Sequence, residues 1–282
     1  MTGAAVSTDS ERGVVTEETG SKRASKARTA VRTHGAEWGT TVGALAVVVI
    51  VWQVAVSLFH IPAYVLPGPL DVARVAGENR SMLLKNTWVT LFEILVGFGL
   101  AIAIGGTGAF IIARSPLLNR LFSPLLTALQ IVPKIAIAPL FVVWFGFGVS
   151  PKILMALVIA FFPILINTAT GFLSESAGMQ DLGRIIGLSP WVYFRKIQLP
   201  NALPIIFSGL KVALTFAVIG SIVGEFVGAS KGLGYIIVLA NSNLDTRLVF
   251  AAIFVITALG LVLYAAVALL ERVCLPWHVS RR

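Results

Sequence analysis

The chain has 282 residues, of which 57% are hydrophobic and only 12% are charged. Soluble domains carry about 25% charged residues, so this composition and its long apolar runs exclude an ordinary soluble domain and indicate an integral membrane protein. The formal net charge of +9 comes from basic residues that flank apolar runs, so we attribute it to membrane topology and expect no nucleic-acid partner.

Residues 1–36 are rich in Ser, Thr, Gly, Ala and charged residues and lack large apolar side chains. This composition predicts a disordered, basic cytoplasmic tail, followed by one membrane domain over residues 37–282. A secretory signal peptide is the alternative interpretation of the N-terminal region. It is disfavoured because the first apolar run is long and is followed by Phe59-His60-Ile61-Pro62 instead of a small-residue cleavage site.

Six apolar runs are long enough to cross a bilayer, which takes about 20 residues. They cover residues 40–59, 87–113, 121–145, 153–172, 205–227 and 249–270. The fold class predicted is therefore an all-α integral membrane protein with six transmembrane helices. Pro133 and Pro139 predict a kink or break in the third helix. Five glycines in the second predict close helix packing: Gly97, Gly99, Gly105, Gly106 and Gly108.

An even number of spans places both termini on the same side of the membrane. Basic residues number 14 on that side and 6 on the other, with Lys152 counted among the outer loops. Because basic residues concentrate in cytoplasmic loops, we expect a multi-pass protein of the cell's inner (cytoplasmic) membrane with both termini in the cytoplasm. The segment 174–204 would then be cytoplasmic as well, and the outer loops are too short to form a large external domain.

Segment 174–204 combines helix signals with aromatic residues outside the apolar runs. Ser189-Pro190 predicts the start of a short helix, because serine caps free amides and proline suits the first helical position. Gly187 predicts a sharp turn before this helix. Leu199-Pro200 and Pro204 predict its end before the fifth span.

The short helix also carries an aromatic run. Trp191, Tyr193 and Phe194 on a helix outside the bilayer predict a docking surface for a soluble partner, with Arg195 and Lys196 beside it. The alternative is a helix that lies on the membrane surface.

The spacing of this segment resembles the cytoplasmic "EAA" motif of permease subunits of bacterial ABC importers. That motif runs acidic–Ala–Ala, three residues, Gly, nine residues, Ile, one residue and Leu-Pro. Every gap matches here, with the conserved positions of the motif held by Asp181, Gly187, Ile197, Leu199 and Pro200. The departures are Asp in place of Glu, and Leu182 and Gly183 in place of the two alanines.

The resemblance extends over residues 45–275 and is closest to the nitrate/sulfonate/taurine group of these permeases. Segments similar to that group occur in its order at residues 65–69, 133–140, 144–148, 162–168 and 232–235. In the family, the short helix after the glycine docks into a groove on a cytoplasmic ATPase. The resemblance therefore implies a coupling role for Asp181, Gly183, Arg184, Gly187, Ser189, Pro190, Trp191, Tyr193, Phe194, Arg195, Ile197, Leu199 and Pro200.

The resemblance also implies partners. No Gly-Lys pair occurs in the sequence, so it has no P-loop for nucleotide phosphates. We therefore expect ATP and Mg²⁺ on a separate cytoplasmic ABC ATPase dimer, with no cofactor and no catalytic residue on this chain. An extracytoplasmic solute-binding protein, a second copy of this chain and membrane lipid complete the expected partners. The cargo implied is a small solute such as a sulfonate, nitrate or a vitamin precursor.

Ionisable residues within the spans are costly and indicate function by default. Lys134, Glu93 and Glu225 are accordingly candidates for the solute pathway, and the basic Lys134 favours an anionic solute there. Lys134 could instead neutralise one of the two carboxylates, and Glu225 could point into outer water. Lys211 is expected to extend its charge to the membrane interface. The three His and one Cys are scattered and predict no metal site.

Two other functions remain to be weighed against an ATP-driven permease. A gradient-driven secondary transporter or channel would use Lys134 and Glu225 as coupling charges, but no internal repeat typical of such proteins is visible. A membrane enzyme acting on lipid is disfavoured because His, Asp and Glu are sparse and unclustered.

Overall fold

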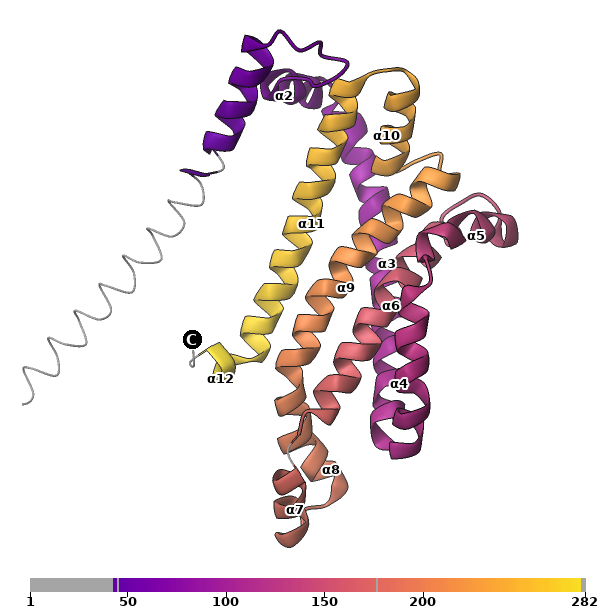
Figure 1. Cartoon of the computed structure of the whole chain (residues 1–282), viewed down its shortest axis with the longest axis vertical. Helices are drawn as coiled ribbons and strands as arrows, with labels where there is room; N and C mark the ends of the chain where they lie inside the picture. The colour runs from indigo at the N-terminus through magenta and orange to yellow at the C-terminus, as the bar shows by residue number, and fades with distance from the viewer. Residues whose placement is uncertain (1–42, 45, 176, 280–282) are drawn as a thin grey trace, which may run out of the picture. The chain divides into compact units, whose positions relative to one another are not determined.

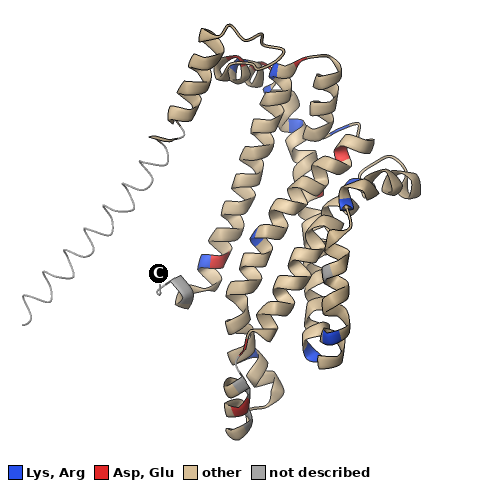
Figure 2. Cartoon of the chain, viewed as in Figure 1, with Lys and Arg blue, Asp and Glu red and all other residues tan. Residues whose placement is uncertain are grey.

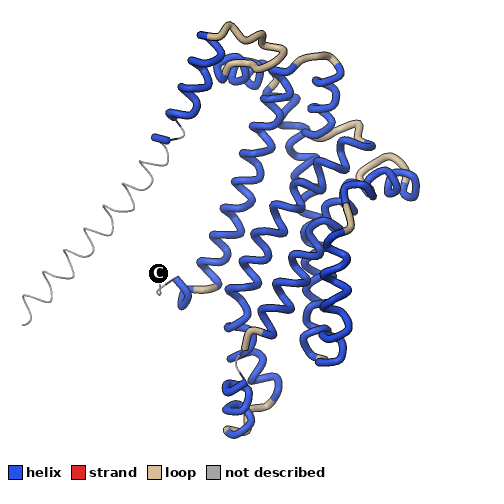
Figure 3. The backbone as a smooth tube through the Cα atoms, in the orientation of Figure 1, coloured by secondary structure: helices blue, strands red, loops and turns tan. Residues whose placement is uncertain are grey.

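The computed structural model describes residues 43, 44, 46–175 and 177–279. Within these residues every regular element is a helix and no strand occurs (Figure 3). The predicted disordered tail at residues 1–36 lies outside the described residues, as does the start of the first predicted span. Residues 62–67 and 71–279 form one compact unit. The described residues up to Ile61, with residues 68–70, form another, in which a short helix covers Ala46–Leu58.

Four helices are long and apolar enough to cross a membrane. They are α3 (Arg80–Arg114), α6 (Ser150–Leu173), α9 (Leu199–Gly228) and α11 (Thr246–Cys274) (Figure 1). Each exceeds the roughly 20 residues that a bilayer requires. Figure 2 shows that charged residues are sparse along these helices. The second, fourth, fifth and sixth predicted spans are thus confirmed as helices, each longer than its apolar run.

The third predicted span is bent. It consists of α4 (Pro116–Ile131), the 3₁₀ helix η1 (Lys134–Ile137) and α5 (Ala138–Phe145), with a bend of 76° at the break. The break predicted at Pro133 is confirmed, because Val132 is extended (ψ 127°), as the residue before a proline usually is. If the bent pair counts as one span, the described residues hold five candidate spans. The first predicted span is represented by Ala46–Leu58, which is shorter than a typical membrane crossing.

The core of the larger unit is the packing of α3, α6 and α9, which lie side by side (Figure 1). Small residues allow this close approach. A Cβ atom at Gly97 of α3 would lie 2.6 Å from Cβ of Ala156, and one at Gly220 of α9 would lie 2.7 Å from Cα of the same residue. The central buried cluster takes side chains from all three helices: Ile94, Phe98, Ala101, Ala156, Ala160, Ile164, Ala213, Leu214 and Ala217.

The packing role predicted for the glycines of the second span is therefore confirmed for those that face α6. Gly97, Gly105 and Gly108 face backbone or side-chain atoms of that helix. Gly99 and Gly106 have open space where a Cβ would lie.

A second buried cluster joins α11 to α10 (Leu233–Ser242), α2 (Pro69–Glu78) and the start of α3. Its buried members are Val72, Leu83, Leu233, Ile236, Ala251 and Ala252. Outside this cluster most of α11 is exposed and apolar, as expected for a helix that faces lipid. The chain then ends its described part in α12 (Pro276–Val279).

Between α6 and α9 the chain forms α7 (Ala177–Ile185), α8 (Pro190–Tyr193) and the π-helix η2 (Phe194–Gln198). The predicted end of the short helix at Leu199-Pro200 is wrong, because α8 continues through η2 into α9 as one helical run over Pro190–Gly228. The amide of Leu199 donates to the carbonyl of Phe194, a π-type hydrogen bond. This wider turn gives Pro200, which has no amide hydrogen, a place in the first turn of α9.

Candidate functional site

The turn between α7 and α8 depends on Gly187. Its φ of +69° lies in the left-handed region, which a glycine adopts without the steric cost that a Cβ imposes. A Cβ there would meet nothing within 4 Å, so backbone conformation and not space favours glycine. The amide of Leu188 closes the turn by donating to the carbonyl of Gly183 at 3.1 Å. The predicted turn is confirmed.

The start of α8 is also confirmed. Ser189 is extended and its hydroxyl accepts a hydrogen bond from the amide of Val192 at 3.4 Å. Pro190 occupies the first helical turn, where no amide hydrogen is needed. These two local signals fix where the short helix begins.

Tyr193 holds α8 against α7. Its hydroxyl donates to the Glu175 carboxylate. Its ring lies so close to Gly183 that a Cβ at that position would be 2.5 Å from Tyr193 Cε2. Gly183, which departs from the alanine of the motif, therefore makes room for this ring.

Phe194 joins the segment to the membrane helices. Its ring lies 5.4 Å from Phe110 of α3 and 5.9 Å from Phe172 of α6, between ring centroids. The Arg114 guanidinium lies 4.8 Å from the Phe110 ring and 5.5 Å from the Phe194 ring, at cation–π distance. Trp191 stacks on Phe194 at 5.8 Å. We call these five residues the aromatic cluster.

The three aromatic side chains that were predicted to form a docking surface thus have different surroundings. Tyr193 and Phe194 are half-buried against their own chain, and Trp191 is 65% exposed. Sequence reasoning missed Phe110, Phe172 and Arg114, which belong to the aromatic cluster. Phe110 and Arg114 are four residues apart at the end of α3, a spacing that brings side chains onto one helix face.

An exposed apolar surface covers α7 and the start of α8. Its side chains, with the exposed fraction of each residue, are Met179 43%, Leu182 51%, Ile185 82%, Ile186 59% and Trp191 65%. Only Trp191 of these was singled out from the sequence. In Figure 1, α7 and α8 lie beyond the ends of α6 and α9. Large apolar groups exposed together outside the spans mark a binding surface.

The remaining predicted coupling residues differ in exposure. Asp181, Arg195 and Lys196 are exposed, and Ile197, Leu199 and Pro200 are half-buried where η2 meets α9. The side chain of Arg184 is outside what the structure describes. Coupling by these residues stays a prediction.

Glu93 lies in a buried polar cluster that the sequence did not predict. Its carboxylate forms an ion pair with the Lys152 ammonium and accepts a hydrogen bond from Ser221 at 3.3 Å. The placement of Lys152 in an outer loop is wrong, because this residue belongs to α6 and is buried. Its ammonium also donates to the Lys231 carbonyl at 3.3 Å. Lys152, and not Lys134, is the cation at Glu93.

Glu225 is buried as well, so the alternative that it points into outer water is wrong. Its carboxylate accepts hydrogen bonds from the Thr90 hydroxyl at 2.6 Å and from the Gly234 amide at the start of α10. Thr90 in turn accepts from the Leu233 amide at 2.9 Å. These bonds tie the α9–α10 connection to α3. A role of Glu93 and Glu225 in the solute pathway stays a prediction.

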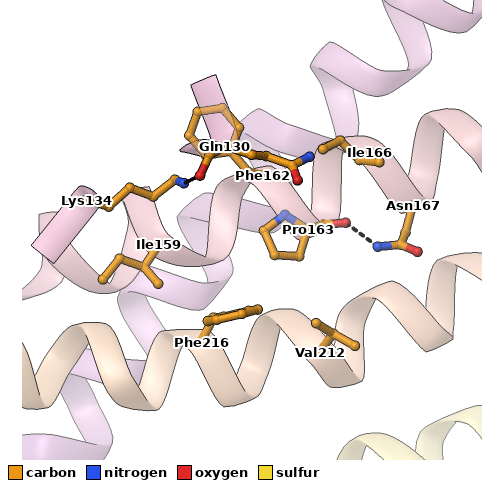
Figure 4. A pocket seen from close by; sticks show the side chains of 9 residues that line it. All are labelled: Gln130, Lys134, Ile159, Phe162, Pro163, Ile166, Asn167, Val212 and Phe216. Carbon is orange, nitrogen blue, oxygen red and sulfur yellow. Dashed lines mark hydrogen bonds between the residues drawn. The ribbon is translucent and has the colours of Figure 1, made fainter. Parts of the chain in front are cut away.

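Lys134 lies apart from both carboxylates, at the edge of a cavity of about 410 Å³ (Figure 4). Its ammonium donates to the Gln130 carbonyl at 3.0 Å and lies 4.7 Å from the centroid of the Phe162 ring. Lys211 forms an ion pair with Glu271 of α11 at 2.9 Å. Its extension to the membrane interface stays a prediction.

Comparisons with known proteins agree with this architecture. A family model described as "Binding-protein-dependent transport system inner membrane component" matches residues 96–273. A probable ABC transporter permease protein of Haemophilus influenzae is 35% identical over 78% of this chain and 90% of its own length. A riboflavin transport system permease protein of Chloroflexus aurantiacus is 36% identical over 84% of this chain and 89% of its own length. A formylaminopyrimidine transport permease protein of Halalkalibacterium halodurans is 34% identical, with 81% and 92% covered.

One solved structure, of the MetNI methionine ABC transporter in an inward-facing conformation, matches with a TM-score of 0.54 and 22% identity. The match covers 67% of this chain and 98% of that chain. At this identity the likeness shows the fold alone.

Proposed function

This chain belongs to the family of binding-protein-dependent transport system inner membrane components, and from that premise we propose that it is the permease subunit of an ATP-driven importer. The family consists of transport permeases and not of enzymes. The observation that carries the proposal is the exposed apolar surface of α7 and α8, which lies outside the membrane-spanning helices. Such a surface needs a soluble partner, and in this proposal the partner is a cytoplasmic ATPase.

The surface has the composition of a docking site. Ile185, Ile186 and Trp191 are large, exposed apolar side chains, and Arg195 and Lys196 are exposed as well. Apolar anchors surrounded by charged residues are the usual anatomy of a protein–protein interface. The hydrogen bond from Tyr193 to Glu175 fixes the short helix α8 to the preceding segment. This bond would keep the apolar anchors in place as the partner binds.

The aromatic cluster supplies a mechanical connection from this surface to the membrane helices. Trp191, at the surface, stacks on Phe194, and Phe194 contacts one ring on α3 and another on α6. Displacement of α8 by an ATPase would therefore act on α3 and α6 together. Packed side chains transmit such displacements because protein interiors are dense and poorly compressible.

The remaining parts of the proposal follow from the family. ATP and Mg²⁺ would be held by two ATPase subunits, a solute-binding protein would deliver cargo from outside, and two copies of this chain would enclose the pathway. The chain would lie in the inner membrane with both termini in the cytoplasm. The cargo would be a small solute, and the relatives described above include permease proteins of riboflavin and formylaminopyrimidine transport.

The test is purification of this chain from its native membrane in mild detergent, with mass spectrometry of the proteins that accompany it. We expect an ATPase in the wild type, loss of that ATPase in Ile185→Asp and its retention in Leu244→Asp. Leu244 is the matched control, because it is as exposed as Ile185 but lies in the α10–α11 connection. A wild-type chain that transports without an ATPase would contradict the proposal and favour a gradient-driven transporter.

A further inference from the structure

The cavity beside Lys134 has the features of a ligand site. It lies between the break in the bent span and the helices α6 and α9, and its volume of about 410 Å³ is within the usual range for small-molecule sites. Its walls come from Gln130 of α4, Lys134 of η1, Phe162 and Asn167 of α6, and Phe216 of α9, with further apolar residues between them.

The charge in this cavity is positive. None of its lining residues is acidic. The Lys134 ammonium has three donors, of which one reaches the Gln130 carbonyl, and its remaining contact is the face of the Phe162 ring. No carboxylate in the lining pairs with this ammonium, and apolar surroundings strengthen the attraction between an ammonium and an anion.

The rest of the lining is apolar and partly aromatic. Phe162 and Phe216 contribute rings, and Ile159, Pro163 and Val212 contribute aliphatic surface (Figure 4). Asn167 donates its amide hydrogen to the Pro163 carbonyl at 2.8 Å, and its side-chain amide stands at one end of the cavity. A ligand would meet a cation at one end, rings along its body and an amide at the other end.

We propose that this cavity binds a small organic anion, with its charged group at Lys134 and its apolar or flat body against Phe162 and Phe216. The proposal rests on the proposed function, since it places one step of the cargo's route in this chain. Binding there would exchange the cation–π contact of Lys134 for a charge-assisted hydrogen bond. Because the two contacts compete, the anion could be released again, as transport requires.

The test measures binding of two probes to the chain purified from its native membrane with its accompanying subunits, placed in phosphatidylcholine nanodiscs. Benzenesulfonate is the anionic probe and benzyl alcohol is the neutral probe of similar size, both measured by equilibrium dialysis. We expect the wild type to bind benzenesulfonate at least about tenfold more tightly than benzyl alcohol, since hydrogen bonds to charged groups exceed neutral ones.

Variants distinguish the contribution of the Lys134 charge to binding from that of the apolar lining. Lys134→Gln should weaken benzenesulfonate binding by about tenfold and leave benzyl alcohol binding unchanged, whereas Lys134→Arg should retain the preference for the anion. Phe216→Ala should weaken both probes. Lys85→Gln is the matched control, because Lys85 is an exposed lysine of α3 outside the cavity, and it should change neither.

Equal binding of the two probes, unchanged binding in Lys134→Gln, or no binding by the wild type would each overturn the site. Loss of benzenesulfonate binding when phosphatidylglycerol is added would assign the site to an anionic lipid headgroup. That result would overturn the proposal that the ligand is a soluble organic anion. The same preparations report the accompanying ATPase. Absence of the ATPase with binding intact counts against the proposed function alone, and its presence without binding counts against the site alone.

Discussion

At the scale of single residues, Phe194 separates the docking role of the cytoplasmic segment from its mechanical role. Phe194→Ala removes three ring contacts, one of them with Trp191, and one cation–π contact, but it deletes none of the side chains of the exposed apolar surface. Ring pairs contribute about 0.5–1.5 kcal/mol each beyond burial. We therefore expect the ATPase to copurify as before while solute uptake falls by about tenfold.

The control for this variant is Phe92→Ala, which removes an exposed phenylalanine from α3 and should leave uptake unchanged. Uptake in membrane vesicles and copurification of the ATPase are measured on the same preparations. Loss of the ATPase in Phe194→Ala would show that this ring belongs to the docking surface, as the sequence alone suggested.

The local features of the cytoplasmic segment were predictable because their signals are local. Gly187 and Ser189-Pro190 carry backbone preferences that hold in any context, and the turn and helix start occur where these residues stand. The packing partners of the Tyr193 and Phe194 side chains were not predictable. They depend on Glu175, Phe110 and Phe172, and nothing in a single sequence indicates which distant rings will meet.

At the scale of elements, prolines were informative where they break a hydrogen-bond pattern and misleading where the helix adapts. Pro133 stands at a real break between α4 and η1. Pro200 does not end its helix, because the π-type bond from Leu199 to Phe194 rearranges the preceding turn. A proline thus predicts a local disturbance, while the surrounding packing decides whether the helix stops.

The packing of α3 on α6 contains an ion pair whose removal should be costly. Lys152 and Glu93 have side chains only 4% and 0% exposed. Lys152→Met leaves a buried carboxylate without its cation, which typically destabilises by about 3–5 kcal/mol. We expect a lower thermal unfolding midpoint in detergent for Lys152→Met, and recovery of most of that loss in the double variant Lys152→Met/Glu93→Gln.

The matched comparison is Lys211→Met, which breaks the ion pair with Glu271 between α9 and α11. Both side chains of that pair are 22% exposed, so water can partly replace the lost partner and the midpoint should fall less. Equal losses for the two lysine variants would contradict the assignment of the Glu93 pair as the more strongly buried one.

At the scale of the whole molecule, the sequence supported the helical membrane fold and the family better than the site. Apolar runs of sufficient length identify spans directly, since the bilayer fixes the length of a crossing. The pairing of Glu93 with Lys152 could not be predicted, because it joins residues far apart in the sequence and Lys152 lies at the edge of an apolar run. The cavity at Lys134 likewise needs three helices in place before it exists.

The exposed face of α9 predicts where two copies of this chain would meet in the proposed homodimer. Val212, Phe216 and Ile219 are exposed and recur at helical spacing, and the first two also line the cavity at Lys134. In a symmetric dimer the same face serves both copies, so equivalent residues near the axis approach one another. A second copy on this face would close the cavity from lipid.

The prediction is that cysteines on this face form cross-linked dimers in native membranes. The sequence has one cysteine, so the background variant is Cys274→Ser. Val212→Cys and Ile219→Cys should each give a dimer band under mild oxidation or with a short thiol linker, whereas Leu261→Cys should not. Leu261 is exposed on α11 and equally apolar, so it reports chance encounters in the bilayer. Cross-linking at Leu261 as efficient as on α9 would mean that the α9 face lies against lipid. The cavity at Lys134 would then open to the membrane and not to a pathway shared by two copies.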